Sequence, residues 1–329
     1  MDATVRWGEK RYNSLDYYIK ETFHEKLYKL SLNAGCTCPN RDGTCGTRGC
    51  IFCSRGGSGD FAADVSLSIP EQLRVEKEKK KSKYSGHSYI AYFQAYTNTY
   101  GPLEVLEKAF TQALADPEVK VLSIATRPDC LSAEILDLLE RLSLIKPVWI
   151  ELGLQTIHES TAEFIRRGYP LPVFEEALKK LRALGLSVIV HTILYLPGES
   201  EADMLETIEY LNRQDIQGIK LQLLHMLKGT DLETYYHETP FPIMTMEEYI
   251  ELLIDCIEHL SPDIVIHRLT GDGPAGLLIA PQWSRSKRTV LNRFHAAMRS
   301  RNTWQGKAFT GQQENSGGAL CRNHLHYIN

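Results

Sequence analysis

The sequence contains no long apolar run. None of its stretches approaches the roughly 20 consecutive apolar residues that a membrane-spanning helix needs. The opening segment, MDATVRWGEKRYNS, is polar and charged and lacks the apolar core of a secretory signal. These absences predict a cytoplasmic protein without membrane association. The hydrophobic content of 43% over 329 residues is nevertheless enough for a substantial buried core.

Acidic residues are scarce towards the C-terminal end. Residues 283–329 contain eight Lys or Arg and a single acid, Glu314, although the whole chain has a net charge of −4. A basic segment on an acidic body indicates a polyanionic partner, because Lys and Arg gain affinity by releasing phosphate counterions. A solvated basic tail is the alternative interpretation. The candidate nucleic-acid contacts are Arg285, Lys287, Arg288, Arg293, Arg299 and Arg301.

The eight cysteines are unevenly distributed, since five of them lie between residues 36 and 53. In a reducing cytoplasm such a cluster indicates metal or redox chemistry more often than disulfides. A closed zinc site needs four ligands, and neither a second CxxC nor an HxxxH pattern follows the pair Cys50 and Cys53. A four-cysteine zinc knuckle within residues 36–53 is still geometrically possible.

Strand-like and helix-like stretches alternate along most of the chain. Six strands are expected to start near residues 26, 88, 119, 148, 186 and 219, with helices between them. This pattern predicts parallel βα units, which right-handed crossovers curl into a partial (βα)6 barrel of the TIM type. Helical spacing at 246–260 and 285–300, around a strand at 263–269, predicts a C-terminal α/β extension. We therefore expect a barrel with the cysteine loop (1–230), an extension (231–310) and a flexible tail (311–329).

The cysteine loop has the clearest chemical pattern. Thiolates bind both zinc and iron–sulfur clusters. A radical S-adenosylmethionine (SAM) site needs three cysteine ligands and one open iron, which the methionine end of SAM chelates. The segment Cys50-Ile51-Phe52-Cys53 fits the C-x-aromatic-C ending of that signature. Spacing alone leaves the remaining ligand open between Cys38 and Cys45.

Further motifs occur in order at the expected strand ends. They are GCTCPNRDG (35–43), CIFC (50–53), YFQAYT (92–97), TRPD (126–129), ELGLQT (151–156), RG (167–168), LPGE (196–199), and the segment from IK (219–220) to KG (228–229). With these motifs the chain, from about residue 10 to 305, resembles the YhcC/YtqA-like branch of radical SAM proteins. It is more distantly similar to the radical SAM domain of the Elongator catalytic subunit.

The resemblance implies a set of cofactors and ligands. In this family the cysteine before Pro-Asn-Arg-Asp-Gly binds the cluster, which implies Cys38 and leaves Cys36 and Cys45 as extra thiols. The implied cofactors are a [4Fe–4S] cluster and SAM, whose cleavage yields a 5′-deoxyadenosyl radical. A flavodoxin- or ferredoxin-like electron donor is implied as a partner.

Several strand-end residues are candidate SAM contacts. The resemblance places Phe52 near the adenine and Leu196 beside it. The Gly-Gly-Glu segment that usually binds the SAM amino group is absent after the second strand. Thr97, Asn98 or backbone carbonyls are expected to replace it, and a polar turn is the alternative.

The fourth and fifth strands supply further candidates. Glu151 and Gln155 share one strand face, where a buried carboxylate and amide need partners such as ribose hydroxyls. Arg167 matches the family's Arg-Gly pair and suits the SAM carboxylate, with helix capping as the alternative. His191 lies in an apolar strand and is either a hydrogen-bonded core residue or a further SAM contact.

Three residues are candidates for the substrate. Arg127 and Asp129 are expected to orient substrate or SAM, or to form a structural salt bridge, and Lys220 is a substrate contact if it points into the barrel. The charge asymmetry and the resemblance to the Elongator domain predict a tRNA substrate, remodelled at the C5 side chain of a wobble uridine. The alternatives are a radical SAM enzyme acting on a small metabolite or a protein, and a non-enzymatic zinc-knuckle nucleic-acid-binding protein.

Overall fold

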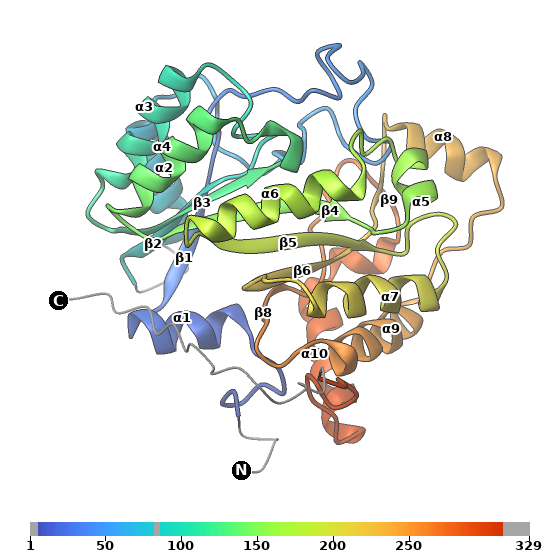
Figure 1. Ribbon diagram of the computed structural model, residues 1–329. Helices are drawn as coiled ribbons and strands as arrows, with labels where there is room; N and C mark the ends of the chain where they lie inside the picture. The colour runs from blue at the N-terminus through green and yellow to red at the C-terminus, as the bar shows by residue number, and fades with distance from the viewer. Residues whose placement is uncertain (1–5, 82–85, 312–329) are drawn as a thin grey trace, which may run out of the picture.

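The computed structural model describes residues 6–81 and 86–311, with one parallel sheet at its centre (Figure 1). Its seven strands follow the order β1-β2-β3-β4-β5-β6-β8, and every neighbouring pair is parallel. Within the described residues β1 and β8 are not paired with each other, so the curled sheet is a half-barrel with one open side. The strands are β1 (Leu27–Leu32), β2 (Ser88–Phe93), β3 (Val119–Thr126), β4 (Val148–Gln155), β5 (Ser187–Leu194), β6 (Gly218–Leu223) and β8 (Val265–Arg268).

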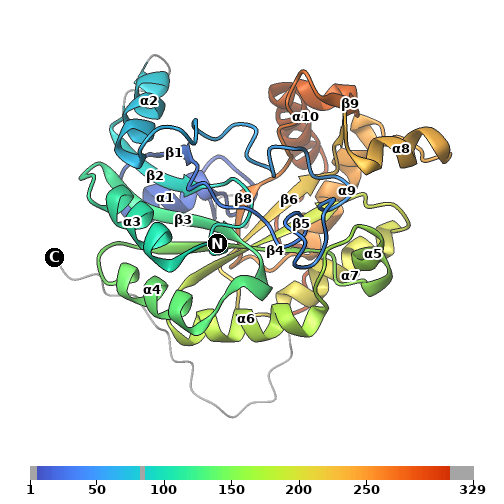
Figure 2. The same ribbon diagram turned by 90° about the horizontal axis from the view of Figure 1, so that it is seen from above.

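Amphipathic helices cover the outer face of the sheet (Figure 2). The central strands β2, β3 and β4 are buried along almost their whole length, as expected of parallel strands that are covered on both faces. Leu106, Phe110, Leu139 and Leu181 on the facing helices are fully buried in the same core. The covering helices are α2 (Ile69–Lys81), α3 (Leu103–Leu114), α4 (Ala133–Ser143), α6 (Leu171–Ala183), α7 (Glu201–Asn212) and α9 (Met246–His259).

The amino-terminal end of the barrel is closed by the helix α1 (Leu15–Phe23). Ile19 of this helix is 3% exposed and packs with Leu27, Ile90 and Trp149 in an apolar cluster inside the sheet. Ser14, which caps α1, also forms a bridge to Ile266 of β8. The interior of the barrel therefore opens at the carboxyl ends of the strands.

The partial barrel with a C-terminal extension is confirmed, with one difference in strand number. The sequence predicts six barrel strands, and the structure has seven, because β8 follows the crossover helix α9 and pairs in parallel with β6. The strand predicted to start near residue 219 is also divided. Its last part, β7 (Met226–Leu227), turns away and pairs antiparallel with β9 (Leu278–Ala280).

Three α-helices remain among the described residues. They are α5 (Glu159–Phe164), α8 (Asp231–Glu238) and α10 (Lys287–Ser300). In the part of the chain that is described, no helix is both long enough and apolar enough to cross a membrane. The predicted flexible tail lies outside the described residues, except for Gly311.

Candidate active site

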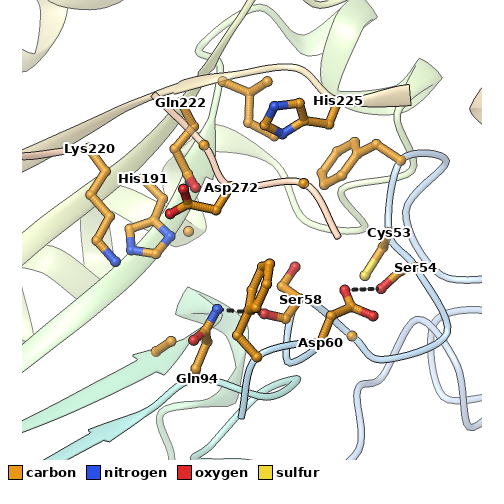
Figure 3. Close-up of a pocket in the computed structure, with 18 of the residues that line it drawn as sticks. Cys53, Ser54, Ser58, Asp60, Gln94, His191, Lys220, Gln222, His225 and Asp272 are labelled. Carbon is orange, nitrogen blue, oxygen red and sulfur yellow. Dashed lines mark hydrogen bonds between the residues drawn. The ribbon is translucent and has the colours of Figure 1, made fainter. Parts of the chain in front are cut away.

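A cavity of about 770 Å³ lies at the carboxyl ends of the strands (Figure 3). Each of the seven strands contributes a lining residue, from Ser31 of β1 to Arg268 of β8. Side chains alternate along a strand, so residues two apart face the cavity together, as Lys220 and Gln222 do. The cavity is lined by eight Lys or Arg side chains and four Asp or Glu side chains. Five of the eight cations are paired with an acid, and among the described residues the other three, Arg41, Lys80 and Arg285, make no ion pair.

Three thiols of the cysteine loop line this cavity, namely Cys38, Cys50 and Cys53. Cys36 instead packs against the apolar core, and Cys45 is exposed; neither lines the cavity. The structure therefore brings together the three cysteines that the sequence analysis selected.

Asn40 and Arg41 hold the cysteine loop in place. The Asn40 amide donates to the carbonyl oxygens of Arg166 at 2.7 Å and Arg167 at 3.2 Å, and it lies 3.4 Å from Cys50 Sγ. The Arg41 guanidinium donates to the carbonyl oxygen of Cys53 at 2.9 Å. The PNRDG motif therefore contributes two side chains that attach the loop to its surroundings.

The three cavity thiols can be compared with the two kinds of metal site that the sequence analysis considered. A tetrahedral zinc ion with Zn–S bonds of about 2.3 Å holds its sulfurs about 3.8 Å apart. Among the described residues, no three cysteine sulfurs lie within 4.8 Å of one another. Three thiols that line one cavity can bind a cluster in which each thiolate is the ligand of a different iron. Three such ligands leave a fourth iron open.

The floor of the cavity contains a buried network centred on Glu151. Its Oε1 accepts from Lys29 Nζ at 3.0 Å and Ser123 Oγ at 2.9 Å, and its Oε2 accepts from His191 at 2.8 Å and from Lys220. Burial opposes ionisation of Glu151, but the charges of Lys220 and Lys29 and the His191 hydrogen bond hold its pKa well below the usual range. Glu151 is therefore a carboxylate whose oxygens have four donors.

This network changes the interpretation of two predicted residues. The sequence analysis expected Glu151 to bind ribose hydroxyls, but protein donors already saturate its oxygens. His191 is hydrogen-bonded, and burial together with the charge of Lys220 lowers its pKa to about 4, so it is neutral near pH 7. Lys220 does point into the barrel, where its Nζ lies 3.2 Å from the Tyr92 hydroxyl.

Gln155 is the residue on β4 that remains available to a ligand. It lines the cavity and has a positive φ of 70°. Its Oε1 is buried and has no hydrogen-bond partner within the described residues. A buried acceptor without a donor carries a free-energy cost of about 1–3 kcal/mol, which a hydroxyl or amino group of a ligand would remove.

Arg167 lines the cavity, as a SAM contact would, but its hydrogen-bond donors are occupied by the protein. Its guanidinium donates to the carbonyl oxygens of Tyr169, Leu154 and Thr156 and to the Glu159 carboxylate, which occupies all five N–H groups. No donor is left for a SAM carboxylate. The Arg167 carbonyl in turn accepts from Asn40, so this arginine supports the cysteine loop.

Gly168, the partner of Arg167 in its motif, is required by close packing. Its φ is +86°, and a Cβ there would lie 2.6 Å from Asn40 Oδ1 and 3.1 Å from Arg127 Nη2. A side chain would therefore push the cysteine loop away from the barrel wall. Packing of the loop explains why the Arg-Gly pair stands at this point.

Arg127 and Asp129 form a bidentate ion pair, with N–O distances of 2.9 and 2.7 Å. Arg127 lines the cavity, whereas Asp129 lines a neighbouring hollow outside it. Arg127 also donates to the Arg167 carbonyl at 3.0 Å. The pair thus positions Arg127, and the carboxylate of Asp129 does not face the cavity.

The other predicted SAM contacts fall into two groups. Phe52 and Thr97 line the cavity. Asn98 and Leu196 are buried but do not line it. The Asn98 amide donates to the carbonyl oxygens of Phe93 and Ala125 and so joins the ends of β2 and β3, and Leu196 packs in an apolar cluster beneath the cysteine loop.

Three of the six basic residues predicted as nucleic-acid contacts near the C-terminal end are paired with acids. Arg288 and Arg299 are exposed and make no ion pair among the described residues, and Arg285 lines the cavity. The other three are paired with acids: Lys287 with Asp272, Arg293 with Glu247, and Arg301 with Glu251. Acids of α9 thus offset Arg293 and Arg301, and Arg285 places one cation of this segment in the cavity.

The sequence analysis missed several residues of the site. Lys29, Tyr92 and Ser123 surround Glu151 or Lys220, and Asn40 and Arg41 hold the cysteine loop. One signal was present in β1 (LYKLSL), where a lysine and a serine two residues apart interrupt an apolar strand. Such a spacing places both on the inner face.

Family models match most of the chain. The model of the radical SAM superfamily matches residues 42–211, and that of the Radical SAM C-terminal domain matches residues 216–300. The chain therefore belongs to the radical SAM superfamily, and its cofactors are a [4Fe–4S] cluster and SAM.

Within this superfamily the chain belongs to the YhcC/YtqA-like family. It is 42% identical over 308 residues to YtqA of Bacillus subtilis. This match covers 94% of this chain and 96% of that protein. It is 34% identical to YhcC of Escherichia coli, over 86% of this chain and 91% of that protein. The solved structure of the archaeal Methanocaldococcus infernus Elp3 has the same fold, with a TM-score of 0.65 and 16% identity over 85% of this chain and 64% of that chain.

More distant relatives match over part of their length. The tRNA uridine(34) acetyltransferase of Methanocaldococcus jannaschii is 27% identical over 169 residues. The match covers 50% of this chain and 30% of that protein.

Proposed function

We propose that this chain is a tRNA-modifying radical SAM enzyme that remodels the C5 side chain of a wobble uridine. The observation that carries the proposal is the set of cations in the cavity, where eight Lys or Arg side chains line the same space as the cysteine thiols and four acids. Three of these cations, Arg41, Lys80 and Arg285, have no ion pair among the described residues. Such a lining favours a polyanionic substrate. The tRNA uridine(34) acetyltransferase that matches over part of its length supports the same substrate class through its name.

Cys38, Cys50 and Cys53 would hold the cluster in this proposal. They are the thiols of the loop that line the cavity, and three ligands leave one iron for the methionine end of SAM. When bound, the cluster and SAM together supply a 5′-deoxyadenosyl radical that abstracts hydrogen from the substrate. The side chains of the protein would then bind SAM and the substrate next to each other, in the orientation that hydrogen abstraction needs, and would exclude water.

The protein groups nearest the cofactors have separate roles in this proposal. Gln155 would accept a hydrogen bond from SAM through its unpartnered Oε1, and Phe52 would pack against the adenine. Arg127 would present its charge to the methionine end of SAM, held there by Asp129. Lys220 would contact the substrate from the cavity floor, with Glu151 fixing its position.

The experiment has two parts, both on anaerobically reconstituted protein. First, we expect a brown protein that cleaves SAM when it is reduced; a colourless protein containing zinc would contradict the enzyme assignment. Second, tRNA nucleosides from cells with and without the gene are compared by mass spectrometry. We expect one wobble-uridine nucleoside to change. Unchanged nucleosides, together with no tRNA binding at low salt, would instead indicate a small-metabolite or protein substrate.

A further inference from the structure

Phe61 is an exposed aromatic residue at the mouth of the cavity. Its side chain is 50% exposed, although it is a large apolar group, and it lines the cavity. No ring or cation packs against it within the described residues. Phe164 offers a contrast, because that ring is 40% exposed, packs edge-to-face on Tyr235 at 5.0 Å and lies outside the cavity.

The segment that bears Phe61 is held firmly. Ser54 Oγ donates to Asp60 Oδ2 at 2.7 Å, and Gln94 Nε2 donates to the Ser58 carbonyl at 2.8 Å (Figure 3). These bonds fix the segment to itself and to the end of β2, immediately before Phe61. The exposed ring is therefore presented from an ordered backbone, which reduces the entropy lost when a ligand packs against it.

Cations flank the same mouth. Lys79 and Lys80 at the end of α2 line the cavity near β1, and Arg268 and Arg285 line it near β8 and β9. Because β1 and β8 are the two outer strands, these groups stand on either side of the open side of the half-barrel. The phosphates of a nucleic-acid strand could contact the cations on both sides of this opening while one base of the strand enters the cavity between them.

We propose that Phe61 is a stacking platform for an unpaired base of the RNA substrate, with Lys80 contacting an adjacent phosphate. This inference rests on the proposed function and names the part of the RNA that is recognised, a nucleotide turned out of a single-stranded loop. Aromatic side chains stack on unpaired bases, and enzymes that modify a base must first take it out of its stack. A fully paired duplex offers no base to the ring.

The test measures RNA binding by the anaerobic holoenzyme. The probes are a fluorescein-labelled RNA hairpin with an unpaired loop, and the same strand annealed to its complement, both followed by fluorescence anisotropy. Loss of one stacked base costs about 1–3 kcal/mol, so we expect Phe61→Ala and Phe61→Leu to bind the hairpin about 5- to 150-fold more weakly. Phe61→Trp should bind it like the wild type, and duplex affinity should not change.

Matched controls come from the chain itself. Phe164→Ala removes a ring that is also exposed, at 40%, but lies outside the cavity, and it should leave hairpin affinity unchanged. Lys80→Ala should reduce the salt dependence of hairpin binding by about one phosphate contact, a slope change of roughly 0.7–0.9. Lys81→Ala should not, because Lys81 pairs with Glu78 and does not line the cavity.

The outcomes separate this inference from the proposed function. If the wild type binds the hairpin and Phe61→Leu binds it equally well, the stacking role is wrong while the RNA substrate stands. If Phe61→Leu loses iron or unfolds at a lower temperature, the ring is structural and the inference is also wrong. If the wild type binds neither the hairpin nor full-length tRNA, the proposed function itself fails.

Discussion

Glu151 and Lys220 form a buried ion pair in the floor of the cavity, where their side chains are 0% and 2% exposed. The Glu151 carboxylate also contacts Lys29 and His191. Its single negative charge therefore compensates the positive charges of two lysines. Burying such groups is costly, and the cost rises sharply when one partner is removed. The cavity floor is therefore sensitive to single substitutions of charge.

Replacing Glu151 with Gln should destabilise the protein strongly. The substitution keeps the volume but leaves Lys29 and Lys220 without a compensating charge, which typically costs about 3–5 kcal/mol. Urea unfolding of the anaerobic protein measures the loss. Glu118→Gln is the control, because Glu118 pairs with Lys77 but is 41% exposed, and such a pair contributes about 0–1 kcal/mol. Equal losses for the two variants would show that the network does not stabilise the fold.

The stability of the protein should fall between about pH 6.5 and pH 4, in part through His191. Burial lowers the pKa of His191 to about 4 in the folded protein, against 6.5 in the unfolded chain. Below pH 6.5 the unfolded state binds the proton first, so the stability present at neutral pH is progressively lost. At 1.36 kcal/mol per pKa unit the effect is at most roughly 3 kcal/mol.

Unfolding free energies of His191→Gln measured across this pH range test the assignment. The variant should show a shallower pH dependence than the wild type. His237→Gln, which changes an exposed histidine, is the control and should follow the wild-type curve. An unchanged slope in His191→Gln would place the pH dependence elsewhere.

Gly168→Ala should impair the cluster loop. A Cβ at this position would lie 2.6 Å from Asn40 Oδ1, and Asn40 holds the loop through its bonds to Arg166 and Arg167. We expect lower iron and sulfide content after reconstitution. Gly185→Ala isolates the packing effect, because its φ of +72° brings similar backbone strain but nothing lies within 4 Å of its Cβ. If both variants retain full iron, the contact is not needed for cluster binding.

The five loop cysteines should divide into two groups. Alanine at Cys38, Cys50 or Cys53 should abolish the brown colour and most bound iron, since each would leave an iron without its thiolate. Alanine at Cys36 or Cys45 should leave the iron content unchanged. Loss of the cluster in Cys45→Ala, but not in Cys38→Ala, would overturn the ligand assignment.

Local sequence patterns predicted the strands and helices of the fold, but they did not predict which strand lies beside which in every case. The strands and most helices could be located because apolar periodicity is a local signal. The place of β8 could not, since a parallel strand joins a sheet through contacts far away in sequence. Residues 263–269 have the same pattern whether they lie in a separate unit or beside β6.

The same limit applies to the candidate site. The chemistry of the Cys50 and Cys53 pair was visible in four consecutive residues, and the ordered motifs indicated the family. The saturation of Arg167 by three carbonyls and a carboxylate was not visible. A guanidinium that suits a SAM carboxylate suits backbone carbonyls equally well, and only the folded chain decides between them.

By itself the sequence determined the alternating strands and helices, the thiol-rich loop after the first strand and the Cys50–Cys53 pattern, because each depends on residues close together in the chain. The tertiary structure decided which side chains face the cavity. Glu151 receives its four donors from β1, β3, β5 and β6, and Phe61 lines the same cavity as Arg268 and Arg285, which are far from it in sequence. Such groups meet only when the sheet curls, since the curvature brings distant strands around one space.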